Sequence, residues 1–266
     1  MLETAIQAAR TAGQILVERL PARREVRVKG LRDIVTDADL AAEEAIVQTI
    51  RARFPDHALL TEEGGESDGS APYVWVVDPL DGTTNYSRRI PTFSVSIGLV
   101  HQGQLAAGVV YDPLRDHLFA VERGRGATLN GAPLRVSQVD RIGGAIVSLD
   151  WSRSQENRRE IVAQLGRIAP DCGTVRGLGS AALGLCYVAA GWTDAYFNVG
   201  LKPWDMAAGL LLIQEAGGRV TDVEGGLWQP WGQRVLASNG HLHQALLDLM
   251  DGVSRADLER DTDQPR

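Results

Sequence analysis

The chain has 266 residues, 44% hydrophobic and 23% charged, a composition typical of a globular protein with a sizeable core. Its formal net charge of -7 leaves no basic footprint for nucleic acid, so small-molecule partners are favoured. Only two cysteines occur, and charged residues interrupt the first 20 positions, so we expect a cytoplasmic protein without a membrane anchor.

Hydrophobic periodicity predicts two amphipathic helices at the start of the chain. The first spans about residues 2–20 and stops before Pro21, and the second spans about residues 37–54 and stops before Pro55. Each helix has one apolar face that needs a partner layer. Four short β-rich segments follow and predict an antiparallel meander: residues 73–77, 93–100, 105–111 and 117–122.

The second half of the chain alternates between short apolar strands and helices. The expected strands are 145–149, a segment near Val175, 193–198 and 234–238. The expected helices are 155–168, 180–190, 204–216 and 241–251. Alternation of this kind is typical of a layered α/β fold.

We expect two halves that share one interface, residues 1–140 and residues 141–252. The segment 253–266 is almost wholly polar and offers too little apolar surface to offset the entropy of ordering. It is therefore predicted to be a flexible tail.

Two aspartates three positions apart follow the hydrophobic run 73–77. Asp78 and Asp81 are separated by Pro79, which fixes the turn, and carboxylates at this spacing suit hard cations such as Mg²⁺. The Gly82-Thr83-Thr84 segment then favours a helix start whose free N–H groups face an anion. The alternative is that the two aspartates only cap a turn.

Three further carboxylate segments favour the metal site over the turn-capping alternative. Each has a purely structural explanation, because Thr36 with Asp39 fits a capping box, Asp205 suits the first turn of a helix, and residues 62–63 suit a solvated loop. Together, however, they place carboxylates at the ends of several elements of one layered fold. Convergence on one site requires cations to offset their mutual repulsion.

With these motifs in this order, the sequence resembles the inositol monophosphatase family over roughly residues 2–250. The two strongest signatures are residues 78–84 (DPLDGTT) and the segment from WDMAAG to EAGG at 204–218. The resemblance implies a layered αβαβα sandwich, assembled as a homodimer. It also implies a Mg²⁺-dependent, lithium-inhibited phosphatase acting on a small phosphorylated substrate.

Carried over residue by residue, the resemblance implies a first metal site formed by Glu62, Asp78 and the Leu80 carbonyl group. A second site is formed by Asp78, Asp81 and Asp205, so that Asp78 bridges two ions. Glu62 also helps to hold a weaker third ion. We therefore expect two to three Mg²⁺ ions per site, with Mn²⁺ able to substitute.

The resemblance also implies roles for residues around these ligands. Asp39 and Thr83 position the attacking water, and Glu63 orients metal-bound water. Lys29 matches a family lysine on a mobile loop beside the third ion. The amides of Gly82 and Thr83 are expected to bind the phosphate group.

Substrate-binding residues are expected from the second half of the chain. The segment Gly179, Ser180 and Ala181 would line the substrate pocket at a helix start. Asn198 stands where inositol-specific members carry a glutamate, which puts selectivity for inositol in doubt, and Lys202 nearby favours a second anionic group.

The leading substrate is therefore inositol 1-phosphate or a similar polyol monoester. Histidinol phosphate and fructose 1,6-bisphosphate are the alternatives, and a nucleotide 3',5'-bisphosphate is disfavoured because no basic pocket is evident. A regulatory binding protein is the non-enzymatic alternative, against which the intact ligand set argues.

Overall fold

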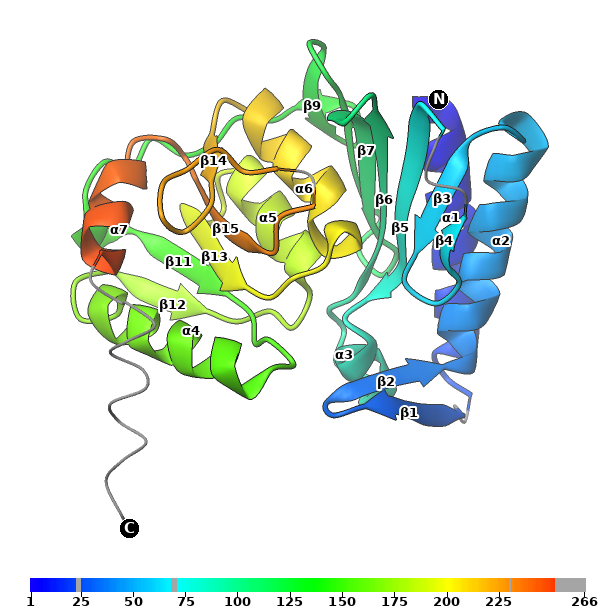
Figure 1. Ribbon diagram of the computed structural model, residues 1–266, viewed down its shortest axis with the longest axis horizontal. Helices are drawn as coiled ribbons and strands as arrows, with labels where there is room; N and C mark the ends of the chain where they lie inside the picture. The colour runs from blue at the N-terminus through cyan, green and yellow to red at the C-terminus, as the bar shows by residue number, and fades with distance from the viewer. Residues whose placement is uncertain (23–24, 68–70, 230, 252–266) are drawn as a thin grey trace.

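The computed structural model describes residues 1–22, 25–67, 71–229 and 231–251, so the tail predicted at 253–266 lies outside the described residues. Five layers stack across the molecule in the order helices, sheet, helices, sheet, helices (Figure 1). This arrangement confirms the predicted αβαβα sandwich. No helix in the described ranges combines the length and apolar character needed to cross a bilayer.

The three helical layers each contain a pair of helices. One outer layer holds α1 (Leu2–Arg19) and α2 (Asp37–Arg53), the central layer holds α5 (Ala181–Ala189) and α6 (Pro203–Glu215), and the other outer layer holds α4 (Gln155–Ile168) and α7 (His243–Met250). A short helix α3 (Thr83–Ser87) and a 3₁₀ turn η1 (Ile142–Gly144) lie in connections. The two helices of the central layer are almost wholly buried, because sheets cover both of their faces.

The first sheet has eight strands in the order β10-β9-β8-β7-β6-β5-β3-β4. Its strands are β3 (Ala58–Thr61), β4 (Gly65–Ser67), β5 (Tyr73–Asp81), β6 (Ser94–His101), β7 (Gln104–Asp112), β8 (His117–Glu122), β9 (Gly126–Leu129) and β10 (Ala132–Pro133). Strands β5 to β8 form the predicted antiparallel meander, which β9 and β10 extend, whereas β3 pairs with β5 in parallel.

The second sheet has five strands in the order β12-β11-β13-β15-β14. Its strands are β11 (Ile146–Leu149), β12 (Thr174–Arg176), β13 (Ala195–Val199), β14 (Arg219–Thr221) and β15 (Arg234–Ser238). Strands β12, β11 and β13 run parallel, so their carboxyl ends lie at one edge of the sheet. A separate hairpin, β1 (Val26–Gly30) with β2 (Asp33–Thr36), packs beside α3.

Paired glycines let the central helix α6 approach the first sheet closely. Gly98 on β6 lies opposite Gly108 on β7. A Cβ atom at Gly98 would stand 2.7 Å from the Cβ of Ala207, and one at Gly108 would stand 2.8 Å from the Cα of Ala208. Only glycine leaves room for the helix here, so this contact fixes the height of α6, and of Asp205 in its first turn, above the sheet.

We expect Gly108→Val to lower the free energy of unfolding by about 1 to 3 kcal/mol, because the added side chain meets the helix backbone. The matched control is Gly166→Ala in α4, where nothing lies within 4 Å of the added methyl group. That change should raise stability by about 0.5 to 1 kcal/mol. Urea unfolding of both variants checks the pair, and an unchanged midpoint for Gly108→Val would contradict the packing argument.

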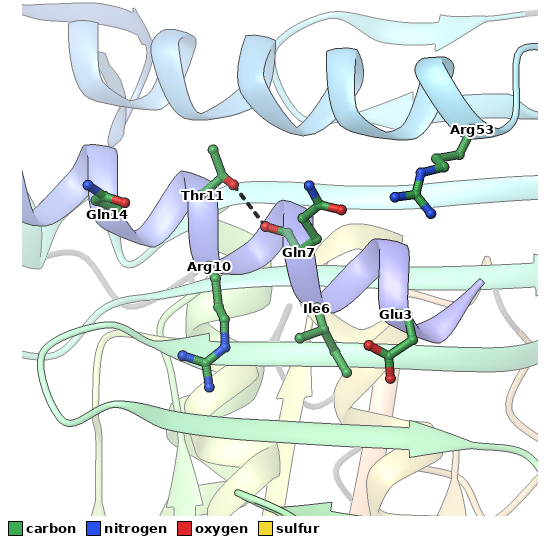
Figure 2. A pocket seen from close by; sticks show the side chains of 7 residues that line it. All are labelled: Glu3, Ile6, Gln7, Arg10, Thr11, Gln14 and Arg53. Atoms are coloured by element: carbon green, nitrogen blue, oxygen red, sulfur yellow. Dashed lines mark hydrogen bonds between the residues drawn. The ribbon is translucent and has the colours of Figure 1, made fainter.

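The outer layer of α1 and α2 borders a pocket of about 480 Å³ (Figure 2). Its lining residues are Glu3, Ile6, Gln7, Arg10, Thr11, Gln14 and Arg53. The Thr11 hydroxyl group donates to the Gln7 carbonyl oxygen at 3.0 Å, an internal helix contact. None of these residues belongs to the site predicted from the sequence.

Candidate active site

The first two carboxylates of the site stand at the ends of neighbouring parallel strands. Thr61 at the end of β3 pairs with Val77 on β5, and the Glu62 N–H group donates to the Val77 carbonyl oxygen at 3.1 Å. Because β3 and β5 run parallel, Glu62 and Asp78 leave the sheet at the same edge. This topology brings together two residues that are 16 positions apart in the sequence.

A bulge in β5 aligns the two aspartates of the DPLD segment. Asp78 lies opposite Ser96 and Asp81 lies opposite Ser94, so three steps on β5 match two steps on β6. In a regular strand, side chains three positions apart point to opposite faces. The bulge contains Pro79, which has no N–H group to donate to the neighbouring strand. Its extra residue returns both carboxylates to the face of the sheet that the central helices cover.

Asp81 joins the two halves of the molecule. It is almost fully buried, and its carboxylate accepts hydrogen bonds from the N–H groups of Ala181 at 3.1 Å and Ala182 at 2.9 Å. The Ser180 and Ser94 hydroxyl groups also donate to it. The N-terminus of α5 therefore stabilises a carboxylate from the first sheet, as expected from the helix dipole.

Asp205 arrives from the first turn of α6. Its carboxylate accepts a hydrogen bond from the Lys202 N–H group at 2.7 Å, which caps the helix after Pro203. Burial raises the pKa of Asp205 to about 8, and the charges of Asp81 and Glu62 add to the shift. Carboxylates from the end of β3, from β5 and from α6 thus lie close enough to perturb one another.

Burial and repulsion between neighbouring carboxylates also raise the pKa values of Asp78 and Asp81, the two aspartates of β5. Burial, followed by the charges of Glu62, Asp81 and Asp205, raises the pKa of Asp78 well above its usual range. Burial also raises the pKa of Asp81 to about 6, although its hydrogen bonds to α5 lower it. Clustered carboxylates that resist ionisation are typical of functional sites.

Two cations hold Glu62. The Arg153 guanidinium lies 3.0 Å from Glu62 and 3.0 Å from Asp33, and the Lys29 Nζ atom lies 3.5 Å from Glu62. Lys29 also contacts Glu63 at 2.5 Å. Arg153 comes from the loop after β11, so this ion-pair network connects the second half of the chain to the β1–β2 hairpin.

The chemistry of these donors fits magnesium. Among the described residues, no three or more His, Cys, Asp or Glu side chains already stand as a metal-binding group. Glu62 pairs with Arg153 and Lys29 instead, and a dication would have to replace them. Even so, buried, mutually repelling carboxylates supply the hard oxygen ligands and the uncompensated charge that Mg²⁺ requires.

Asp39 and Thr83 contact each other, as the sequence led us to expect of a positioning pair. The Thr83 hydroxyl group lies 3.1 Å from Asp39 Oδ1 and 3.0 Å from the Leu80 carbonyl oxygen. Asp39 also closes the capping box of α2 with Thr36, whose N–H group donates to it at 2.9 Å. Burial raises the pKa of Asp39 to about 6 despite these hydrogen bonds.

The expected phosphate segment and the expected substrate segment lie side by side. Gly82 has φ of 95°, and a Cβ atom there would stand 3.0 Å from the Gly179 carbonyl oxygen. The Asn85 side chain donates to the carbonyl oxygens of Thr92 and Leu178, both at 2.8 Å. Asn85 therefore fastens the loop before α5 to the loop after α3.

Asn198 lies deeper than the sequence led us to expect. Its side chain is fully buried, and its Nδ2 group donates to the Asp150 carbonyl oxygen at 2.6 Å. In this structure it supports the end of β11 and exposes no surface to a substrate. Lys202, by contrast, is exposed at the start of α6.

Sequence reasoning missed four polar residues at this site. Asn85 lies just past the DPLDGTT signature, and Glu43 accepts a hydrogen bond from the Glu63 N–H group at 2.9 Å. Arg153 and Asp150 both lie in the loop after the strand predicted at 145–149, and the polar character of that loop is the signal that could have identified them.

Comparisons with known proteins agree with this geometry. The Inositol monophosphatase family matches residues 1–254. The Nus factor SuhB of Escherichia coli K12 is 42% identical over 261 residues, covering 96% of this chain and 98% of that protein.

Two solved structures are similar throughout their length. The extragenic suppressor protein suhB of Bartonella henselae has a TM-score of 0.90 at 37% identity, covering 94% of this chain and 98% of that one. The inositol monophosphatase of Anabaena sp. PCC 7120 has a TM-score of 0.86 at 36% identity, covering 96% and 97%. This chain therefore belongs to the inositol monophosphatase family.

Proposed function

We propose that this protein is a Mg²⁺-dependent phosphatase of small polyol or sugar phosphate monoesters, with inositol 1-phosphate as the leading substrate. The observation that supports this function best is the meeting of Glu62, Asp78, Asp81 and Asp205 in a buried cluster with raised pKa values at Asp78, Asp81 and Asp205. These carboxylates come from three parts of the fold: the end of β3, strand β5 and the first turn of α6. Family membership supports phosphatase activity and metal dependence in general.

Glu62, Asp78, the Leu80 carbonyl oxygen, Asp81 and Asp205 would hold the metal ions. When bound, Mg²⁺ supplies Lewis-acid stabilisation of the phosphoryl oxygens and lowers the pKa of bound water. Phosphoryl transfer needs little else from a protein than positioning and charge compensation.

The remaining roles follow from contacts. The Asp39 carboxylate, linked to the Thr83 hydroxyl group at 3.1 Å, orients the attacking water and takes up its proton. Its pKa of about 6 leaves it mostly ionised at neutral pH, as a proton acceptor must be. The amides of Gly82 and Thr83 bind the phosphate group, and Glu63, held by Lys29, orients a further water.

The alcohol part of the substrate is expected to contact the segment Gly179, Ser180 and Ala181, and Lys202 at the start of α6. Ser180 and Ala181 are partly committed to Asp81, so substrate binding and ligand positioning share the N-terminus of α5. Lithium inhibition and a homodimer stay predictions from the family resemblance, and a cytoplasmic location stays a prediction from the cysteine content and the charged N-terminal segment.

A panel of esters with Mg²⁺ tests the proposed substrate class. We expect the highest kcat/KM for inositol 1-phosphate or another neutral polyol monoester, and lower values for histidinol phosphate and fructose 1,6-bisphosphate. A preference for the bisphosphate would move the assignment to the sugar bisphosphatases. Failure to hydrolyse any phosphate ester would reject the function.

That last result would favour the second candidate, a regulatory binding protein. The relatives named Nus factor SuhB give this candidate its support. The two hypotheses differ in what they predict for Asp81. A phosphatase needs Asp81 for turnover, whereas a binding protein needs no turnover at all.

A further inference from the structure

Asp150 is a buried acidic group for which the proposed mechanism has no use. It follows β11 directly, at the edge where the parallel strands β11, β12 and β13 end. Ligands of open α/β sheets bind beyond the carboxyl ends of such strands. The connections that leave this edge lead to the ion-pair loop of Arg153, to the Gly179 segment and to Lys202.

The Asp150 carboxylate faces the segment expected to contact the substrate. Its Oδ1 atom accepts a hydrogen bond from the Gly179 N–H group at 2.6 Å, and its Oδ2 atom lies 3.3 Å from the Tyr196 hydroxyl group. The Leu178 N–H group also donates to this carboxylate. A carboxylate offers about four acceptor positions, so these three contacts leave capacity for another donor. The residue as a whole is 8% exposed, and its carboxylate adjoins the Gly179 segment that is expected to line the substrate pocket.

The surroundings of Asp150 select a neutral donor. Among the described residues no basic side chain forms an ion pair with Asp150, and Asp81 adds a negative charge to its field. Burial raises the pKa of Asp150 to about 7. An additional anionic group is therefore disfavoured here, whereas a hydroxyl group can donate to the carboxylate without adding charge.

The strand end that carries Asp150 is held firmly. The Asn198 amide on the adjacent strand β13 donates to the Asp150 carbonyl oxygen at 2.6 Å, and Leu149 pairs with Phe197 one step earlier. Asp150 is thus held in place through both its backbone carbonyl group and its side chain. A binding group that is rigid before the ligand arrives discriminates well between ligands, because little conformational entropy is lost on binding.

We propose that Asp150 is a specificity-determining residue that accepts a hydrogen bond from a hydroxyl group of the substrate's alcohol part, which selects neutral polyol monophosphates over bisphosphates. This inference rests on the proposed phosphatase function and narrows its substrate class. A purely structural role, in which Asp150 only anchors the loop before α5, predicts instead that substrates with and without hydroxyl groups are affected equally.

The test compares two esters on Asp150→Asn, which keeps the size of the side chain and an acceptor for the Gly179 N–H group. We expect kcat/KM for myo-inositol 1-phosphate to fall about 10- to 100-fold, mainly through KM, as for a lost hydrogen bond to a charged group. The value for 4-nitrophenyl phosphate, which has no hydroxyl group, should stay within about threefold. Equal losses for both esters, or no loss for either, would overturn the inference.

Asp194→Asn is the matched control. Asp194 is also buried and accepts a backbone hydrogen bond, from the Ile146 N–H group at 2.7 Å, but at the opposite end of the same strands. We expect this variant to lose stability without changing the ratio of the two kcat/KM values. A changed ratio would mean that the assay reports general damage to the sheet.

Calorimetric binding separates this inference from the proposed function. If the wild-type protein hydrolyses neither ester, the phosphatase assignment fails, and the affinities of wild type and Asp150→Asn for myo-inositol 1-phosphate and inorganic phosphate are compared instead. An affinity loss of about tenfold or more, confined to the inositol ester, supports the hydroxyl contact. Parallel affinities would reject it.

Discussion

Replacing Asp78 with asparagine is expected to lower kcat/KM for a phosphate monoester at least about 10³-fold, with folding intact. Asp78 is 2% exposed and is the proposed bridge between two ions, so the amide removes a ligand charge shared by both. The rate is measured at saturating Mg²⁺, and the fold is checked by thermal unfolding.

Stability distinguishes this effect from misfolding. Because burial and neighbouring carboxylates raise the pKa of Asp78, its ionised form destabilises the metal-free folded state. Asp78→Asn should therefore raise the melting temperature in the presence of a chelator. Asp112→Asn is the control, since Asp112 is equally buried but pairs with Arg115 at 2.7 Å outside the site. An active Asp78→Asn enzyme would contradict the proposed ligand set.

Removal of metal by EDTA is expected to abolish turnover, to below about a thousandth of the Mg²⁺-saturated rate, and re-addition of Mg²⁺ should restore it. At about 100 times its Kd, Mg²⁺ should also raise the melting temperature by about 5 to 10 °C. Both measurements use the same dialysed sample, so loss of activity with an unchanged fold is distinguished from unfolding.

The stabilisation by Mg²⁺ should grow with pH. In the folded, metal-free protein the pKa of Asp81 is raised to about 6 and that of Asp205 to about 8, both above the values of an unfolded chain. The folded state therefore holds more protons between about pH 4 and pH 8, and its stability falls as pH rises through this range. Mg²⁺ binds the deprotonated carboxylates and offsets this loss. If Mg²⁺ raised the melting temperature equally at pH 6 and pH 8.5, the proposal that it binds these carboxylates would be contradicted.

Much of the fold was predictable because it depends on local patterns. The apolar stripe and the stop at Pro21 gave the first helix within one residue of α1, and the run before Asp78 gave the core of β5. Thr36 with Asp39 gave a capping box that the structure contains. Periodicity and caps act over a few residues, so they can be read from sequence.

Other features depend on contacts that no local pattern encodes. The β1–β2 hairpin was missed because β1 is exposed along its whole length and shows no hydrophobic alternation. The bulge that aligns Asp78 with Asp81 exists only through pairing with Ser94 and Ser96 on β6. Periodicity alone would have placed the two carboxylates on opposite faces.

The candidate site, like the fold, combines features that local motifs predict with features that depend on tertiary contacts. The acidic ligand candidates came from short motifs, but the burial of Asn198 and the position of Asp150 follow from the register between β11 and β13. Arg153 contacts Glu62 across 91 positions of sequence, a pairing that only the layered fold produces. Tertiary contacts of this kind decide which polar residues surround the motif.

The most direct test is a crystal structure of the protein soaked with Mn²⁺, with the ions located by their anomalous scattering. We expect at least two peaks per chain, one between Glu62 and Asp78 and one between Asp78, Asp81 and Asp205, with Arg153 displaced from Glu62. Absence of peaks at these carboxylates, with Arg153 and Lys29 still paired to Glu62, would show that protein cations alone balance the cluster.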